Sequence, residues 1–269
     1  MSLYNVYFAP NGVDPSGTYE IDVHYYMTYF MGKHNPCLSD NDAKSIADAD
    51  QGTDEDPDTS PALGLTADQG QINRQFHHLG NQATIDAQGN PSTYLEEQWR
   101  AAVPDSLPGR ASQNCNPKNL GIYLHHLQDT FSHEGYRSPV WGHAFGFKTV
   151  DHTASNIPKA RLMAHATWEA LLAYSFRCNP CCYQEKIKGR EEALYQEMVD
   201  QLEQFFKEPA GTFISGITPG EIAKRADLLG GIPIRPDPAP PAPTPWPGQG
   251  APRHSDGRGN LGNDLPVNW

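Results

Sequence analysis

Three residues in the middle of the chain are spaced so that an α-helix would place them side by side. His125, Asp129 and His133 follow one another at intervals of four residues. Each such step turns a helix by about 40° beyond a full turn, so the three side chains would share one face. Two imidazoles and a carboxylate on one face can hold divalent cations. The spacing predicts a metal site, and the alternative is a core helix with three hydrogen-bonded polar residues.

Further histidines and carboxylates lie on both sides of this segment. Asp50 and Asp54 stand one helical turn apart, either as ligands or as part of a solvated acidic face. His165 and Glu169 repeat the four-residue spacing, which suits a shared ion or a hydrogen-bonded pair on the surface. The remaining candidates are His24, one imidazole of the pair His77 and His78, His143, Asp151 and His152. A set of imidazoles and carboxylates without thiolates suits zinc and similar ions.

Helical patterns account for most of the chain up to residue 231. We expect helices over residues 19–31, 40–54, 96–103, 117–134, 158–176, 189–207 and 218–229. Ser39 or Asp40 is expected to cap the second helix, and Thr218 with Glu221 forms the pattern of a capping box. Because little of the chain alternates with a period of two, we predict a mainly α-helical, single metal-binding domain over residues 1–231.

Residues 232–269 differ from this domain because they are rich in proline, and residues 238–247 read PAPPAPTPWP. Such a composition cannot build a core, so we expect an extended, polyproline-like or disordered tail. Trp246 and Trp269 are the residues of this tail that could pack against the domain.

The overall charge and hydropathy limit the classes of partner. The formal net charge of −12 argues against broad electrostatic binding to nucleic acid. It leaves room for a phosphate substrate, because bound divalent cations can reverse the local field. No apolar run approaches the roughly 20 residues that a membrane-spanning helix needs. The chain as given begins without a basic segment followed by an apolar one, so no secretory signal is expected in it.

The five cysteines do not form the pattern of a zinc knuckle. Cys178 and Cys181 have a C-x2-C spacing, but no second pair of ligands follows them. A local disulfide or reduced thiols fit this segment better. The odd number of cysteines leaves at least one thiol unpaired within a monomer.

In their order along the chain, these motifs resemble the superfamily of zinc-dependent phospholipases C and single-strand-specific zinc nucleases. His125 and Asp129 match the H-x3-D motif of that superfamily, in which the aspartate bridges two metal ions. The resemblance is closer to an uncharacterised bacterial branch, and it rests on residues 22–29, 47–54, 76–77, 124–133 and 142–143. It covers roughly residues 19–175 and implies a helical fold with a trinuclear zinc cluster.

The resemblance implies a role for each candidate ligand. The first zinc would be held by His77, His125, Asp129 and Asp54. The second would be held by His133 and His143, completed by Asp151 or by the pair His165 and Glu169. The third would be held by His24 together with Asp129. Asp54 would also orient or deprotonate the attacking water.

Two features of the chain depart from the characterised enzymes. Those enzymes complete the third zinc site with an N-terminal tryptophan, whereas the first tryptophan of this chain is Trp99. The spacing from Asp129 to His133 is also shorter than in the phospholipases. We therefore expect two or three zinc ions.

The resemblance implies hydrolysis of a phosphodiester by a metal-bound hydroxide, with a small phosphate ester or a phospholipid head group as the substrate. One alternative is a zinc-dependent nuclease or nucleotidase that uses the same site. Another is a non-catalytic structural or effector protein whose metal ions are fully coordinated by side chains. Members of the superfamily are often secreted.

Overall fold

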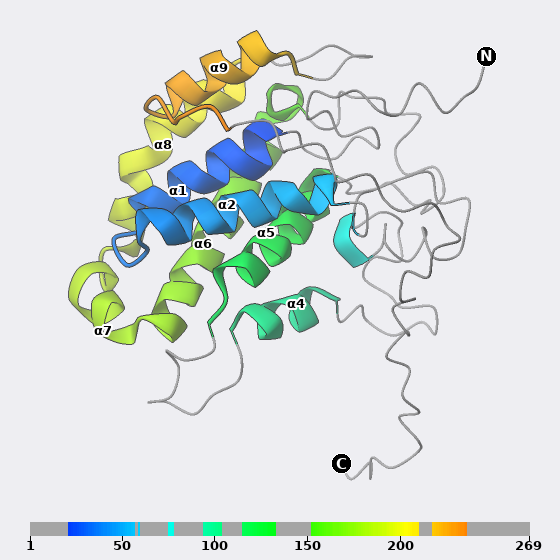
Figure 1. Ribbon diagram of the computed structural model, residues 1–269. Helices are drawn as coiled ribbons and strands as arrows, with labels where there is room; N and C mark the ends of the chain where they lie inside the picture. The colour runs from blue at the N-terminus through cyan, green and yellow to red at the C-terminus, as the bar shows by residue number, and fades with distance from the viewer. Residues whose placement is uncertain are drawn as a thin grey trace, which may run out of the picture. The chain divides into compact units, whose positions relative to one another are not determined.

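The computed structural model describes residues 21–56, 59, 75–77, 94–103, 115–132, 152–209 and 217–235, and no β-strand occurs among them (Figure 1). The predicted mainly α-helical fold is confirmed. The chain divides into two units, residues 1–234 and 235–269, and every helix described here belongs to the first. His133, His143 and Asp151 lie outside the described residues, as does nearly all of the proline-rich segment.

The helices follow the order of the sequence pattern closely. The elements are η2 (Asp22–Met27), α1 (Thr28–His34), α2 (Asp40–Glu55), α4 (Tyr94–Ala102), α5 (Pro117–Ser132), η5 (Thr153–Ser155), α6 (Ile157–Cys178), α7 (Pro180–Cys182), η6 (Tyr183–Ile187), α8 (Glu191–Lys207) and α9 (Pro219–Leu228). The segment η2 is a π-helix that continues directly into α1. Residues 75–77 add one helical turn. No helix in the described part of the chain is long and apolar enough to cross a membrane.

Local capping explains where two of these helices begin. The Ser39 side chain accepts a hydrogen bond from the backbone of Asp42, whose carboxylate accepts one from the Ser39 backbone. Thr218 and Glu221 make the same reciprocal pair at the start of α9. Each pair satisfies backbone N–H groups that have no partner within the helix. Both predicted capping sites are thereby confirmed.

Helix α2 packs between α1 and α5, and the contact with α5 is unusually close at Gly121 (Figure 1). A β-carbon built on Gly121 would overlap the carbonyl oxygen of Ile46 and lie 2.8 Å from the backbone nitrogen of Asp50. Gly121 therefore lets the two backbones approach where a larger residue would separate them. His125 follows one turn later, so this contact sets the distance between the polar residues of α2 and those of α5.

A buried guanidinium joins the start of the described chain to its end. The Nε atom of Arg225 in α9 lies 2.7 Å from a carboxylate oxygen of Asp22, and both side chains are almost fully buried. Other nitrogens of Arg225 donate to the backbone carbonyl of Glu208 and, at 2.8 Å, to the hydroxyl of Thr153. The guanidinium also lies 4.0 Å from the centre of the Phe205 ring. These contacts anchor η2 two residues before His24.

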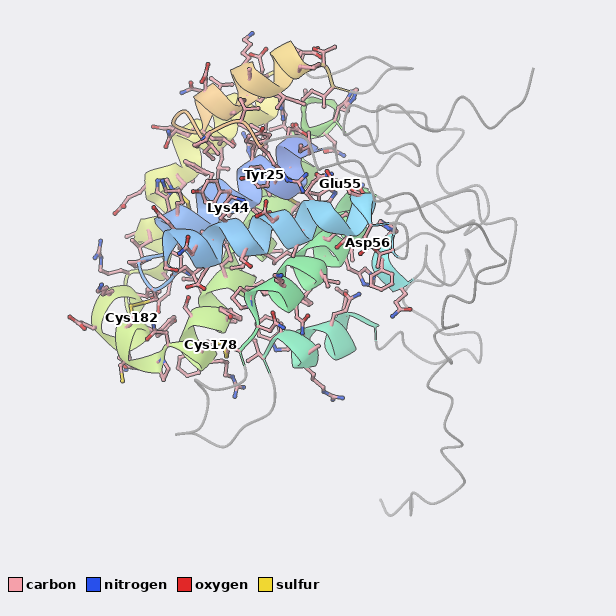
Figure 2. The ribbon with its side chains drawn as sticks, in the orientation of Figure 1. Tyr25, Lys44, Glu55, Asp56, Cys178 and Cys182 are labelled. Atoms are coloured by element: carbon pink, nitrogen blue, oxygen red, sulfur yellow. A yellow bond between two sulfur atoms is a disulfide. The ribbon has the colours of Figure 1, made fainter. Side chains whose placement is uncertain are left out.

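Two disulfide bonds join segments that are distant in sequence. Cys37 is bonded to Cys182, and Cys115 is bonded to Cys178. Cys178 and Cys182, labelled in Figure 2, are the last residues of α6 and α7. The prediction of a local disulfide or of reduced thiols within residues 178–182 is therefore wrong for Cys178 and Cys182, which are bonded to distant cysteines. Cys181 is the free, exposed thiol that the odd count required.

Replacing Gly121 with alanine should destabilise the protein, because the new methyl group would overlap the backbone of α2. We expect a loss of about 1–3 kcal/mol in the free energy of unfolding. Gly52→Ala is the matched control, since a β-carbon there has no heavy atom within 4 Å. It should stabilise helix α2 by about 0.5–1 kcal/mol. Chemical denaturation with chelator present measures both, and equal effects of the two substitutions would contradict the close contact.

Removing the disulfide that closes the longer loop should cost more stability than removing the neighbouring free thiol. The loop between Cys37 and Cys182 spans 145 residues. We expect the double variant Cys37→Ala/Cys182→Ala to lose about 2–5 kcal/mol. Cys181→Ala should change the free energy of unfolding by less than about 0.5 kcal/mol, because its side chain is exposed. Thermal unfolding without reductant compares them, and similar melting temperatures would refute a stabilising role for this bond.

Candidate metal centre

Six ionisable side chains from four segments of the chain meet inside the bundle. They are His24 from η2, Asp50 and Asp54 from α2, His77 from residues 75–77, and His125 and Asp129 from α5. Each is buried, and Asp54, at 7% exposure, is the only one of the six with measurable contact with solvent. Two overlapping groups of metal-ligating atoms occur among them, one of His24, Asp50 and His125, the other of Asp54, His77 and His125.

Four atoms of this cluster are spaced like the corners of a tetrahedral zinc site. The Nε2 atom of His125 lies 3.0 Å from Nδ1 of His77, 3.3 Å from Oδ1 of Asp54 and 3.4 Å from Oδ2 of Asp129. The Nδ1 atom of His77 lies 3.5 Å and 3.3 Å from the same two oxygens. Ligands at about 2.0–2.1 Å from a tetrahedral ion stand about 3.3 Å apart. We call this set of four atoms the His77 position.

The ring proton of His77 is held on the side away from this position. Its Nε2 atom lies 2.6 Å from the backbone carbonyl oxygen of Thr59, which can only accept a hydrogen bond. The Nε2–H group therefore donates to Thr59. In a neutral imidazole the lone pair is then on Nδ1, the atom that faces His125, Asp54 and Asp129.

The ring of His24 is oriented through Nδ1, whereas the ring of His77 is oriented through Nε2. Its Nδ1 atom lies 3.0 Å from Oδ1 of Asp50 and 2.8 Å from Oε1 of Gln128. Because a carboxylate only accepts, Nδ1 carries the proton and the lone pair of the neutral ring is on Nε2. That atom lies 3.6 Å from Oδ1 of Asp129 and 3.9 Å from Oδ2 of Asp54. We call these three atoms the His24 position.

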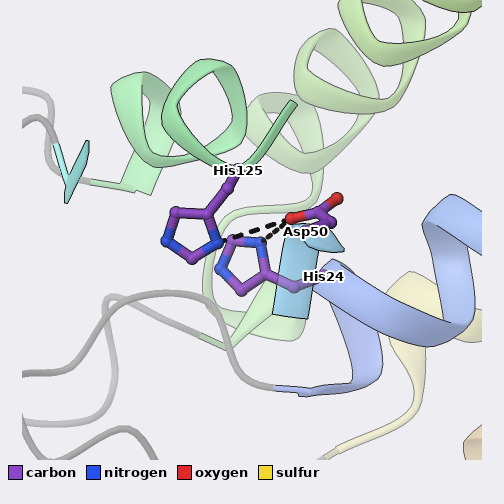
Figure 3. Close-up of side chains that lie close together, drawn as sticks. All are labelled: His24, Asp50 and His125. Atoms are coloured by element: carbon purple, nitrogen blue, oxygen red, sulfur yellow. Dashed lines mark hydrogen bonds and ion pairs between the residues drawn. The ribbon is translucent and has the colours of Figure 1, made fainter. Parts of the chain in front are cut away.

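His125 lies between the two other imidazoles. Its ring stacks on that of His24, with centroids 4.1 Å apart, and meets the edge of the His77 ring at 4.9 Å. The Nδ1 atom of His125 faces Oδ1 of Asp50 at 3.4 Å, and Figure 3 shows the Asp50 carboxylate beside the two stacked rings, in contact with both. The proton of a neutral His125 thus points to Asp50 and its lone pair to the His77 position. All three imidazoles direct one nitrogen toward the carboxylates of Asp54 and Asp129.

The carboxylates also control the charge of the imidazoles. Burial lowers the pKa of His125, but Asp54 and Asp129 together raise it by more than burial lowers it. The pKa of His125 therefore stands well above its usual value. Burial and the nearby His125 lower the pKa of His24, while Asp50 and Asp54 outweigh them and raise it. Protons on the imidazoles offset the buried carboxylates when no cation is bound. A metal ion would replace those protons.

The remaining sequence candidates are placed as follows. His165 and Glu169 lie 3.7 Å apart on α6 with side chains 44% and 67% exposed, and their role beside His133 and His143 stays a prediction. They are not among the groups of metal-ligating atoms formed by the described residues. His126, the neighbour of His125 in the sequence, is buried and contacts Gln98 at 3.1 Å. His77 is the last residue of the helical turn formed by residues 75–77.

From the sequence, Asp50 is either a ligand or part of a solvated acidic face, and Gln128 and Thr28 are not candidates. Asp50 is fully buried, and its carboxylate faces His24 and His125. The signal for Asp50 was its one-turn spacing from Asp54. Gln128 lies beside Asp129 in the sequence, and nothing in that pattern distinguishes it from a surface glutamine.

No protein-family model, curated protein or solved structure matches this chain.

Zinc should stabilise the protein more strongly as the pH rises. Without metal, the raised pKa of His125 contributes stability below its ordinary value of 6.5, and this is lost as the pH rises through the folded pKa. Zinc needs the deprotonated imidazoles, so its contribution grows over the same interval. We expect the difference in melting temperature between zinc-loaded and chelated protein to increase as the pH rises above about 6.5 and through the raised pKa of His125.

The control for this measurement is His165→Ala, which removes an exposed histidine outside the cluster. Its profile should match that of the unmodified protein, whereas His125→Ala should lose most of the zinc-dependent difference. A zinc effect of the same size at every pH would contradict the assignment of these imidazoles as ligands.

Proposed function

We propose that the protein is a metal-dependent hydrolase of phosphoric esters, similar to the zinc-dependent phospholipases C. The observation that carries the proposal is the convergence of three imidazole nitrogens on Asp54 and Asp129, at 3.3–3.9 Å from their oxygens. A buried set of imidazoles and carboxylates without sulfur suits zinc. The resemblance of residues 19–175 to that superfamily supports the choice of reaction.

In this proposal the two carboxylates serve both metal positions. Oδ1 of Asp54 and Oδ2 of Asp129 belong to the His77 position, and their other oxygens face Nε2 of His24. Each carboxylate can thereby contact two cations and reduce their mutual repulsion. His133, His143 and Asp151 stay predictions for a further position.

Asp54 is the residue that we assign to the chemical step. It is the member of the cluster with measurable exposure, so it lies nearest to solvent. A zinc ion in the site would lower the pKa of a bound water toward ~7 and stabilise charge on phosphoryl oxygens. Asp54 would orient the attacking water toward the phosphorus atom and accept its proton. The proton would then pass to the oxygen of the leaving group as its bond to phosphorus breaks.

The substrate class follows from charge. With a formal net charge of −12, the protein repels long polyanions, whereas a small phosphate ester or a phospholipid head group places its charge only at the metal centre. The two disulfides support a site of action in an oxidising compartment, where such bonds persist.

The test combines metal analysis with hydrolysis assays on the full chain. We expect two or more zinc ions per chain, with chelator-sensitive hydrolysis of a generic phosphodiester and of phosphatidylcholine vesicles. Asp54→Asn should lower the rate by about 10²-fold or more, because a positioned acid or base contributes about that factor. His165→Ala should leave the rate within about twofold, because His165 lies outside the cluster.

Two results would change the assignment. Faster turnover of single-stranded DNA or nucleotides than of phosphodiesters and phospholipids would favour the nuclease alternative. A fully metallated protein that hydrolyses no phosphoric ester would favour a structural role, in which side chains complete the coordination and leave no place for water.

A further inference from the structure

We propose that Thr28 and Gln128 are positioning residues for His24, which keep its ring proton on Nδ1 and its lone pair on Nε2, the atom that faces Asp54 and Asp129. The inference rests on the proposed metal centre and concerns residues that do not themselves face the His77 position. It follows from the direction of each hydrogen bond in a buried relay between α1, α2 and α5.

The first link of the relay is the hydroxyl of Thr28. Its Oγ1 atom lies 2.7 Å from Oδ2 of Asp50. A carboxylate only accepts, so the single hydroxyl proton of Thr28 is donated to Asp50. The hydroxyl oxygen is then left as an acceptor for any other neighbour.

The second link fixes the amide of Gln128. Its Nε2 atom lies 2.8 Å from Oγ1 of Thr28 and 3.5 Å from Oγ1 of Thr167. Thr28 has already donated its proton, and the hydroxyl of Thr167 donates to the backbone carbonyl of Met163 at 2.9 Å. Both hydroxyl oxygens therefore accept from the amide nitrogen. The reversed amide would set its oxygen against them.

The third link is the histidine itself. With its nitrogen turned to Thr28, Gln128 presents Oε1 to Nδ1 of His24 at 2.8 Å. Oδ1 of Asp50 faces the same nitrogen at 3.0 Å, so two acceptors surround it. A ring proton on Nε2 would leave the Nδ1 lone pair against two oxygens, which is unfavourable in a buried site.

The four residues of the relay are shielded from water. Thr28, Asp50, Gln128 and His24 each have 0% exposure, so water does not reach the relay to take over a missing donor or acceptor. Thr28 also follows His24 by one helical turn, which places both side chains on the same side of the η2–α1 helix. The relay therefore acts most directly on the His24 position. The His77 position, where Thr59 orients His77, meets the relay only through the 3.4 Å contact between Asp50 and Nδ1 of His125.

The experiment uses the full-length protein and stepwise zinc binding in competition with a chelator. Thr28→Val keeps the shape of the side chain and removes the hydroxyl. We expect it to weaken the His24 position about 10–100-fold, the usual effect of losing a partner that orients a ligand. Affinity at the His77 position should stay within about threefold. Thr28→Ser restores the hydroxyl and should restore binding.

A matched control is Thr167→Val, the same substitution at another buried threonine of the relay. It removes the long contact with Gln128 and the hydrogen bond from the Thr167 hydroxyl to the carbonyl of Met163, and neither contact involves His24 or Asp50. Zinc affinity should therefore stay within about threefold of the unmodified protein. A second readout is independent of affinity. Nitrogen-15 NMR of the zinc-loaded protein should show a slowly exchanging Nδ1–H proton on His24, which should exchange faster in Thr28→Val and as slowly as in the unmodified protein in Thr28→Ser. If Thr28→Val does not fold, Gln128→Met carries the same test.

The outcomes separate this inference from the proposed function. Unchanged zinc affinity and an unchanged Nδ1–H signal in Thr28→Val would overturn the positioning role alone. Equal loss at both metal positions would also overturn it, because that pattern indicates general damage to the bundle. An unmodified protein that binds zinc as described without hydrolysing phosphoric esters would overturn only the hydrolase. An unmodified protein that binds no zinc would overturn both.

Discussion

Three carboxylates buried beside three imidazoles impose the main constraint on this bundle. Isolated charges are costly to transfer from water into a protein interior, so Asp50, Asp54 and Asp129 need positive charge close by. Protons on His24 and His125 supply part of it, which is why the pKa of each is raised. Divalent cations would supply more. The spacing of α2 and α5 meets this need, since the absence of a side chain at Gly121 brings the charged faces of the two helices within reach.

The disulfides and the ionisable cluster lie toward opposite ends of the same helices. Cys37 joins α1 to α2, and Cys115 precedes α5, so the disulfides tie the C-terminal end of α1 and the N-terminal ends of α2 and α5 to the region of Cys178 and Cys182. The cluster takes its residues from η2 and from the later turns of α2 and α5. Covalent bonds thus hold one end of these helices and electrostatic contacts the other.

The helices could be predicted from the sequence because their signals are local. Capping boxes at Ser39 and Thr218 lie within four residues, and the spacing of His125 and Asp129 defines a shared face. The disulfides and the pair of Asp22 with Arg225 join residues far apart in sequence, so no local pattern indicates them. His165 and Glu169 show the limit of spacing arguments. A four-residue interval defines a face of a helix, and only packing decides whether that face meets the core or solvent.

The role of each histidine depends on what its outer nitrogen contacts. In His77 the carbonyl of Thr59 accepts a hydrogen bond from Nε2, so the lone pair of the neutral ring is on Nδ1. In His24 the carboxylate of Asp50 accepts from Nδ1, so the lone pair is on Nε2. His126 is as deeply buried as its neighbour His125, yet it faces Gln98, whose amide donates to the backbone carbonyl of Gln75. Through that contact α4 and α5 hold the short turn that carries His77. Residues that bind no ion themselves therefore determine which nitrogens converge on Asp54 and Asp129, and with it the chemistry that the cluster can perform.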